Sequence, residues 1–269
     1  MGTKGKNIKK YLKKNVPNVV IEKYWQFRKY VAISNFVKSY QGDKVYCPIC
    51  KSKYTIFGPV GIPERENARC FKCNSLERHR LVYLFLENNT DIFTEKQLKL
   101  LHFAPEKAFY NVFSERTNID YYPCDLVPER FKFSQNVIIQ KVDITNIPFD
   151  NDSFDFIICN HVLEHVIDDI RAMKQLYKVL KKGGVAILQV PIDYNLEFTY
   201  EDLTITTPKE RENAFGQFDH VRTYGKDYVK RLINVGFGVE EVDYTKEFTD
   251  EEINKFGFEN GEKIYLCKK

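Results

Sequence analysis

Residues 154–192 read FDFIICNHVLEHVIDDIRAMKQLYKVLKKGGVAILQVPI, and this stretch decides the fold of the chain. An apolar run at 156–159 predicts a buried strand. Apolar residues then recur at helical spacing, at Ile170, Met173, Leu176, Tyr177 and Leu180. Lys-Lys-Gly-Gly at 181–184 should stop that helix, and a second buried strand follows at 185–190. Strand, helix and strand with short connections form the βαβ unit of a parallel sheet.

Polar side chains stand directly after the first of these strands. Asn160 and His161 end the apolar run. In parallel sheets ligands bind beyond the carboxyl ends of the strands. We therefore expect Asn160 and His161 to lie in a ligand-binding or catalytic site.

The same residues carry a family resemblance. The block FDFIICNHVLEHV, followed by LYKVLKKGGVAILQVP, resembles the fourth-strand to fifth-strand region of class I S-adenosylmethionine-dependent methyltransferases. The resemblance extends over residues 98–267. The later segments FGQFDHVRTYG and YVKRLINVGFGVEEV resemble the substrate side of an uncharacterised bacterial group that carries an N-terminal zinc ribbon. The resemblance to class I methyltransferases implies a Rossmann-like α/β sheet of seven mostly parallel strands. The last strand is expected to be antiparallel, and helices are expected on both faces.

The methyltransferase domain is expected to span 76–269. Its strands are predicted at 98–103, 119–124, 137–142, 154–160, 185–190, 237–244 and 262–267. An insertion at 193–223 is polar and aromatic and lacks clear periodicity. A long irregular segment at this place is expected to be a lid or a wall of the substrate site.

Composition places the chain among ordinary globular proteins. It has 269 residues, of which 43% are hydrophobic and 29% charged. No apolar run approaches the roughly 20 residues that a transmembrane helix needs, and no signal-peptide core follows Met1. Four of the seven cysteines have metal-site spacing, which favours a reducing compartment. We expect a cytoplasmic protein.

The net charge of +4 is unevenly distributed. Residues 1–40 hold ten Lys or Arg against one acid, Glu22, and so carry +9, whereas the remaining 229 residues carry −5. Residues 1–42 are predicted to form a basic arm and an amphipathic, aromatic helix at 17–40. The simpler interpretation packs this helix on its own domain; the alternative lays it on an anionic membrane surface.

Two CxxC knuckles, CPIC at 47–50 and CFKC at 70–73, define a zinc ribbon-like module at 43–75. The expected ligands are Cys47, Cys50, Cys70 and Cys73. Four thiolates predict a structural zinc, because a complete sulfur set leaves no open coordination position. Four reduced cysteines or a redox dithiol are the alternatives. Ser75 is predicted to cap the helix that follows.

Basic side chains gather in and just after this module. They are Lys51, Lys53, Arg65, Arg69, Lys72, Arg78, His79 and Arg80. Together with the basic arm they could bind the phosphates of RNA or an anionic substrate. The simpler interpretation is a solvated surface around a zinc clip.

The turn after the first predicted strand departs from the family pattern. Methyltransferases of this class carry a glycine-rich turn there, whereas this chain reads LLHFAPE at 100–106. The resemblance implies cofactor contacts from His102, Ala104 and Glu106. Ala104 is small enough for close approach, and Glu106 would bind the methionine ammonium group. A site that has lost its cofactor is the alternative.

The resemblance places the rest of the cofactor on later turns. Asp125 follows the second strand, 19 residues after Glu106, where a carboxylate can accept both ribose hydroxyls. Asp143 would meet the adenine amine and Ile144 would pack on the ring. Asn160 and His161 would close the pocket near the methionine end.

HVLEH at 161–165 also matches the HxxEH pattern of inverted zinc proteases. The match lies inside the methyltransferase block, and no third ligand is evident in the sequence. We therefore expect His161 to border the cofactor, with Glu164 and His165 forming hydrogen bonds near the start of the helix.

The catalytic candidate lies in the insertion, in Asp219-His220-Val221-Arg222. His220 could accept the proton of a hydroxyl or amine nucleophile. Arg222 could bind a substrate carboxylate or phosphate, with Tyr194 and Tyr224 lining the same cavity. In the alternative, Asp219 and Arg222 form an ion pair that only shapes the loop.

The sequence thus predicts methyl transfer from S-adenosylmethionine to an oxygen or nitrogen of a small metabolite or sugar-containing substrate, with zinc in a structural role. One alternative is an RNA methyltransferase that grips phosphates with the ribbon and the arm. The other is a non-catalytic cofactor-binding or scaffold protein.

Overall fold

A computed structural model describes residues 37–61, 64–131, 133 and 138–269. The basic arm and nearly all of the helix predicted at 17–40 lie outside the described residues. Within them, no helix is long and apolar enough to cross a membrane.

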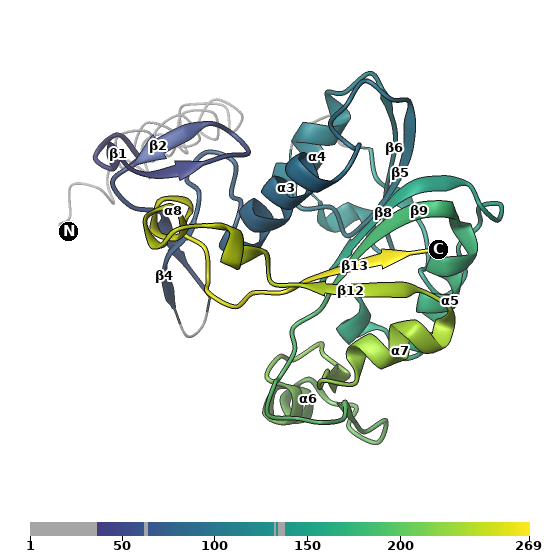
Figure 1. The fold of residues 1–269 in the computed structure, drawn as a ribbon. Helices are drawn as coiled ribbons and strands as arrows, with labels where there is room; N and C mark the ends of the chain where they lie inside the picture. Colours follow the sequence, from purple (N-terminus) through teal and green to yellow (C-terminus); the bar gives the residue numbers. More distant parts are fainter. Residues whose placement is uncertain (1–36, 62–63, 132, 134–137) are drawn as a thin grey trace, which may run out of the picture.

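Seven strands form one sheet in the order β12-β13-β9-β8-β5-β6-β7 (Figure 1). The strands are β5 (Leu98–Phe103), β6 (Ile119–Asp125), β7 (Gln140–Lys141), β8 (Phe154–Asn160), β9 (Leu180–Gln189), β12 (Gly238–Val242) and β13 (Ile264–Lys268). β13 runs antiparallel to β9 and β12, and the other neighbours are parallel. The predicted Rossmann-like sheet is confirmed.

Apolar residues on both faces explain why the central strands are buried. Leu101 and Ile157 pack with α5 (Asp169–Val179) and α7 (Tyr228–Val235), while Leu100 and Ile158 pack on the opposite face. That second face is covered by α3 (Glu77–Asn89) and α4 (Lys107–Ser114). Because successive strand residues point to opposite sides, an unbroken apolar run supplies both layers.

The helix of the deciding stretch ends earlier than predicted. α5 begins at its N-cap Asp168 and ends at Val179, because Leu180 is already extended and pairs with Phe154. The Lys-Lys-Gly-Gly sequence does not stop the helix. It forms an irregularity inside β9, where Gly183 adopts a φ of +77°, which favours glycine.

The insertion at 193–223 contains more regular structure than predicted. α6 (Pro208–Phe215) begins with a capping box between Thr207 and Glu210. β10 (Tyr200–Glu201) pairs with β11 (Arg222–Thr223). The Thr-x-x-Glu spacing was a sequence signal for this helix start.

Two small hairpins form the cysteine module at the edge of the molecule (Figure 1). They are β1 (Gln41–Cys47) with β2 (Ser52–Tyr54), and β3 (Gly58–Val60) with β4 (Arg65–Arg69). The helix α8 (Asp250–Phe256), from the far end of the sequence, packs beside β1, where the rings of Tyr46 and Phe256 lie 6.3 Å apart.

Arg80 holds the module and the C-terminal segment together. Its guanidinium is completely buried and lies 3.9 Å above the ring of Phe57. It donates to the carbonyls of Ala68, Ser75, Phe256 and Gly257 at 2.6 to 3.1 Å. Arg80 therefore cross-links the module and the C-terminal segment by buried hydrogen bonds, and the suggestion that it binds phosphate is wrong.

The start of α3 differs from the prediction by one residue. The N-cap is Leu76, whose N–H is accepted by Nδ1 of His79 at 3.2 Å. The hydroxyl of Ser75 lies instead 3.3 Å and 3.2 Å from the sulfurs of Cys47 and Cys73. Ser75 therefore supports the cysteine cluster and does not cap the helix.

Candidate active site

A cavity of about 730 Å³ opens beyond the carboxyl ends of β5, β6 and β8. Five of the predicted cofactor residues line it: Ala104, Asp125, Asp143, Ile144 and His161. The volume falls in the range of about 300–1,000 Å³ that small-molecule sites occupy. The turns singled out in the sequence therefore meet at one opening.

Asp125 ends β6 with its side chain nearly buried. One carboxylate oxygen accepts the N–H of Val127 at 2.7 Å, and the other accepts from Arg130 at 2.6 Å. A carboxylate oxygen offers more than one acceptor position, so both can still take hydroxyl hydrogens. Arg130 is a further cavity residue that no sequence pattern indicated.

Ala104 makes the first turn without glycine. Its φ is +48°, in the left-handed region that glycine normally occupies, and its N–H donates to Cys124 at 2.9 Å. His161, after β8, has a φ of +54°. Strained backbone of this kind gathers at functional sites. Both residues line the large cavity.

Glu106 lies in a polar network behind the cavity and does not line it. Its carboxylate accepts from Asn160 at 3.0 Å, lies 3.0 Å from Nε2 of His102 and 3.6 Å from Nε2 of His79. Burial alone would raise the pKa of Glu106, but the hydrogen bonds from His102 and Asn160 outweigh it and lower the pKa to about 2. The network keeps Glu106 ionised.

Asp143 and Ile144 follow β7 as expected. One oxygen of Asp143 accepts the N–H and the hydroxyl of Thr145, both at 2.8 Å, which fixes the turn. Ile144 is buried and presents an apolar surface to the cavity. This pairing of an acid with an apolar wall suits a heteroaromatic base.

A second cavity, of about 480 Å³, lies beyond β9, between the sheet and the cysteine module. His161 and Tyr194 line it together with charged residues from distant parts of the chain: Arg65, Glu77, Arg78, Glu259, Glu262 and Lys263. Burial raises the pKa of Glu262. His161, at the end of β8, lines both cavities, so they are adjacent there.

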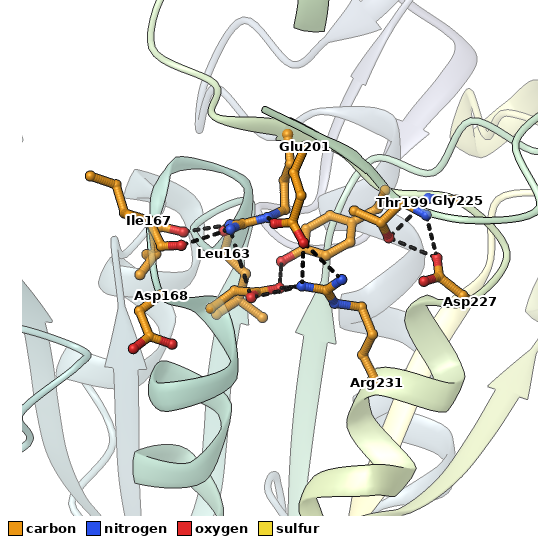
Figure 2. Close-up of polar contacts among 12 residues, drawn as sticks. Leu163, Ile167, Asp168, Thr199, Glu201, Gly225, Asp227 and Arg231 are labelled. Atoms are coloured by element: carbon orange, nitrogen blue, oxygen red, sulfur yellow. Dashed lines mark hydrogen bonds and ion pairs between the residues drawn. The ribbon is translucent and has the colours of Figure 1, made fainter. Parts of the chain in front are cut away.

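Arg222 and Tyr224 do not lie where the sequence analysis expected. Both are buried and neither lines the two cavities. The Arg222 guanidinium donates to the carbonyls of Leu163, Val166 and Ile167 and pairs with Glu201. Figure 2 shows Leu163, Ile167 and Glu201 in this network.

The hydroxyl of Tyr224 donates to Asp169 at 2.7 Å, and Arg231 pairs with the same carboxylate (Figure 2). Arg222 and Tyr224 are thus structural, and a substrate role for them is wrong. The alternative ion pair between Asp219 and Arg222 does not form either, since Asp219 approaches His165 instead.

His220 lies at the edge of the large cavity, beside His165. The two rings are 4.8 Å apart and nearly perpendicular. Burial lowers the pKa of His220. Its loop neighbours Gln217 and Asp219 line the cavity, whereas His220 itself does not. The insertion thus contributes to the wall of this cavity.

The four module cysteines converge as the spacing predicted. The sulfurs of Cys47 and Cys73 are 3.6 Å apart, and those of Cys50 and Cys70 are 3.5 Å apart. All four are unbridged, and their sulfurs lie within 4.8 Å of one another. A zinc tetrahedron with bonds of about 2.3 Å separates sulfurs by about 3.8 Å, so the cluster fits this ion.

Residues 104–188 match a family model described as a methyltransferase domain. Among curated relatives, the chloroplastic 2-methyl-6-phytyl-1,4-hydroquinone methyltransferase 2 of Oryza sativa subsp. japonica is 32% identical over 99 residues, which cover 36% of this chain and 28% of that protein. A demethylmenaquinone methyltransferase of Staphylococcus epidermidis is 36% identical over 53 residues, covering 20% of this chain and 22% of that protein. The chain thus spans about a quarter of the length of these relatives.

Solved structures resemble the chain at low identity. A chain of the Haloferax volcanii complex between the Trm112 methyltransferase activator and a methyltransferase has a TM-score of 0.49 and 16% identity, over 71% of this chain and 90% of its own. An Aquifex aeolicus SAM-dependent methyltransferase has a TM-score of 0.41 and 13% identity, over 70% and 87%. Similarity at this level adds no argument about activity. The family match therefore indicates a methyltransferase domain at residues 104–188, which lie within the seven-stranded sheet.

Proposed function

We propose that the protein is an S-adenosylmethionine-dependent methyltransferase, with the cofactor in the 730 Å³ cavity and the acceptor in the 480 Å³ cavity. The observation that carries this proposal is that His161 lines both. A methyl donor and its acceptor must meet at one point, and these two cavities share His161 at the carboxyl edge of the sheet, where ligands of such folds bind.

The residues of the large cavity fit this cofactor. Asp125 would accept the ribose hydroxyls, Asp143 the adenine amine, and Ile144 would pack on the adenine ring. Glu106 would supply a negative charge near the methionine end through the network with His102 and Asn160. When bound, S-adenosylmethionine supplies an activated methyl group, so the protein needs no covalent intermediate and contributes mainly by positioning.

The second cavity favours a small polar acceptor, such as a metabolite or a sugar-containing compound. Its lining carries both signs of charge, with Arg78 and Lys263 opposed by Glu262 and Glu259. The names of the matched relatives specify hydroquinone and demethylmenaquinone substrates. A wall lined by Arg, Lys and Glu side chains disfavours a lipid-like tail, since these groups need polar partners when buried.

The cysteine cluster completes the proposal with a structural zinc. Four sulfurs at tetrahedral separations, with the Ser75 hydroxyl beside two of them, make a closed site. The ion would fix the module, whose residue Arg65 lines the second cavity and pairs with Glu77 of α3. Zinc would thereby act on the acceptor site through the shape of the module.

RNA remains the second candidate acceptor, because the chain has a basic N-terminal segment. Two of the eight basic residues suggested as phosphate ligands, His79 and Arg80, are buried. RNA binding that weakens steeply with salt and is lost on deletion of residues 1–40 would favour this candidate.

Calorimetric titration with S-adenosylmethionine tests the cofactor site. We expect binding by the zinc-loaded protein, and a loss of affinity of about 10- to 100-fold in Asp125→Ala, because a hydrogen bond to a charged group contributes about 1.5–3 kcal/mol. Glu262→Gln, in the second cavity, is the matched control and should bind the cofactor normally. A folded wild-type protein without affinity for S-adenosylmethionine would instead favour the scaffold alternative.

A further inference from the structure

The HxxEH turn and the predicted catalytic loop come together in space. Glu164 and His165 lie in the short 3₁₀ turn Leu163–His165, and His220 reaches them from the insertion. One ligand atom from each of these three side chains lies within 4.8 Å of the others. His161, the first residue of the sequence motif, is not part of this cluster.

The carboxylate of Glu164 is buried and incompletely bonded. The residue is 1% exposed, and one oxygen lies 3.4 Å from Nδ1 of His161. Among the described residues, nothing donates a hydrogen bond to the other oxygen, Oε2. A buried carboxylate oxygen without a partner is costly, and a cation bound there would remove that cost.

The two histidines are arranged as metal ligands commonly are. Nδ1 of His165 lies 3.2 Å from the carbonyl oxygen and 3.4 Å from the carboxylate of Asp219. An outer carboxylate or carbonyl that holds one ring nitrogen orients the other toward a metal. The ring of His220 packs 4.8 Å from that of His165, which brings both imidazoles to the same point.

Buried hydrogen bonds hold the turn and the loop in register. Arg222 donates to the carbonyls of Leu163 and Ile167, and the N–H of Val221 donates to the carbonyl of Glu164 at 2.9 Å. Figure 2 shows Leu163 and Ile167 at this anchor. The bonds tie together the two segments that supply the three ligands, so the cluster does not depend on exposed side chains meeting by chance.

We propose that Glu164, His165 and His220 bind a divalent transition-metal ion, of the Zn²⁺, Co²⁺ or Fe²⁺ type, at the wall of the large cavity. Two imidazoles and one carboxylate suit these ions better than Mg²⁺ or Ca²⁺, and three protein ligands leave a coordination position open. His165 and Asp219 line the cavity, so the ion would lie beside it.

The role of this ion rests on the proposed function. The acceptor would reach past His161 from the second cavity, and the open position of the ion would hold its reacting oxygen or nitrogen atom. His220 would then be a metal ligand in place of the base suggested by the sequence. Binding of the ion itself is independent of methyl transfer.

Cobalt titration of the chelator-treated full-length protein tests the site. We expect two equivalents of Co²⁺ per chain: one with the near-ultraviolet charge-transfer band of cobalt–thiolate bonds, from the cysteine cluster, and one without it. Glu164→Gln, which keeps the side-chain size, and His220→Ala should each lose the second equivalent and keep the first. His79→Gln, a buried histidine outside the cluster, is the matched control and should bind two.

A wild-type protein that binds only the thiolate-bound ion would overturn the proposal, as would two equivalents in a folded Glu164→Gln protein. Should His220→Ala fail to fold, the Glu164→Gln protein decides. S-adenosylmethionine titrations on the same samples separate this result from the proposed function. Absence of the second ion with normal cofactor binding would reject the metal site alone.

Discussion

Ala104 shows at the scale of one residue how the fold replaces a glycine. An alanine in the left-handed region costs about 1–2 kcal/mol, yet its single methyl group still allows close approach to the cavity. We expect Ala104→Gly to bind S-adenosylmethionine as the wild type does. Ala104→Val should lose at least about 1 kcal/mol of unfolding free energy and bind the cofactor weakly, because a branched side chain tolerates positive φ poorly. Denaturant titration and calorimetry measure both; equal behaviour of the two variants would contradict this interpretation.

His79 is a second residue with a measurable consequence. Burial lowers its pKa from 6.5 to about 3, and its unprotonated Nδ1 accepts the N–H of Leu76. Below pH 6.5 the unfolded chain takes up a proton that the folded chain refuses, so the unfolding free energy should fall as the pH decreases from 6.5 toward 3.

His79→Gln keeps an acceptor for that N–H but cannot titrate. We expect its unfolding free energy to vary less with pH over this window, by up to about 1.4 kcal/mol per pH unit. Denaturant unfolding of both proteins at several pH values gives the slopes, and parallel slopes would reject the assignment. Loss of the proposed zinc at low pH would affect both proteins and cancel in the difference.

Residue types at strand ends were predictable, whereas their partners were not. Asp125 and Asp143 follow predicted strands, and this position together with the family resemblance placed them at the cavity. Arg222 carries no local sign of burial, because its carbonyl partners in Leu163 and Val166 lie about sixty positions earlier in the chain. As a basic residue in a polar loop, Arg222 was therefore predicted to bind a ligand. Only the three-dimensional structure shows that it is buried and bonded to the carbonyls of an earlier turn.

At the scale of elements, the turn between β8 and α5 depends on the insertion. Arg222 supplies donors to three carbonyls of the turn and is fully enclosed. Arg222→Met should lower the unfolding free energy by about 3–5 kcal/mol, because it leaves Glu201 and Asp169 short of a cation. Lys226→Met, which removes an exposed ion pair with Glu197, should cost less than about 1 kcal/mol. Chemical denaturation compares the two variants, and equal losses of unfolding free energy would argue against a stabilising role of buried Arg222.

The elements themselves were read from the sequence with uneven success. Each of the seven predicted strand ranges overlaps one strand of the sheet, including the polar strands β7 and β12. The short helix α6 was not predicted, because its eight residues show little periodicity and its capping box was the only signal. The Lys-Lys-Gly-Gly sequence was misjudged, since glycines at positive φ serve an irregular strand as readily as a helix end.

At the scale of the whole molecule, the cysteine module and the sheet form one connected structure. Arg80 joins the module to Phe256 and Gly257, and Ala108 of α4 packs in the cluster around the cysteines. Removal of the proposed zinc should therefore loosen elements far away in sequence. We expect chelation, or Cys47→Ser, to raise hydrogen exchange in α8 as well as in residues 41–73 while β5 and β8 stay protected. Unchanged exchange in α8 would show that the module opens alone.

The contact between Arg80 and Phe256 also sets an order of events during synthesis. The two residues are 176 positions apart. Until residues 250–257 have left the ribosome, the Arg80 guanidinium lacks two of its four carbonyl partners and stays exposed to water. The cysteine cluster is synthesised earlier than α8 and would take up the proposed zinc early, but it can dock on the sheet only among the last steps. A chain interrupted before α8 would present an open module and a bare charge to the cell's quality-control machinery.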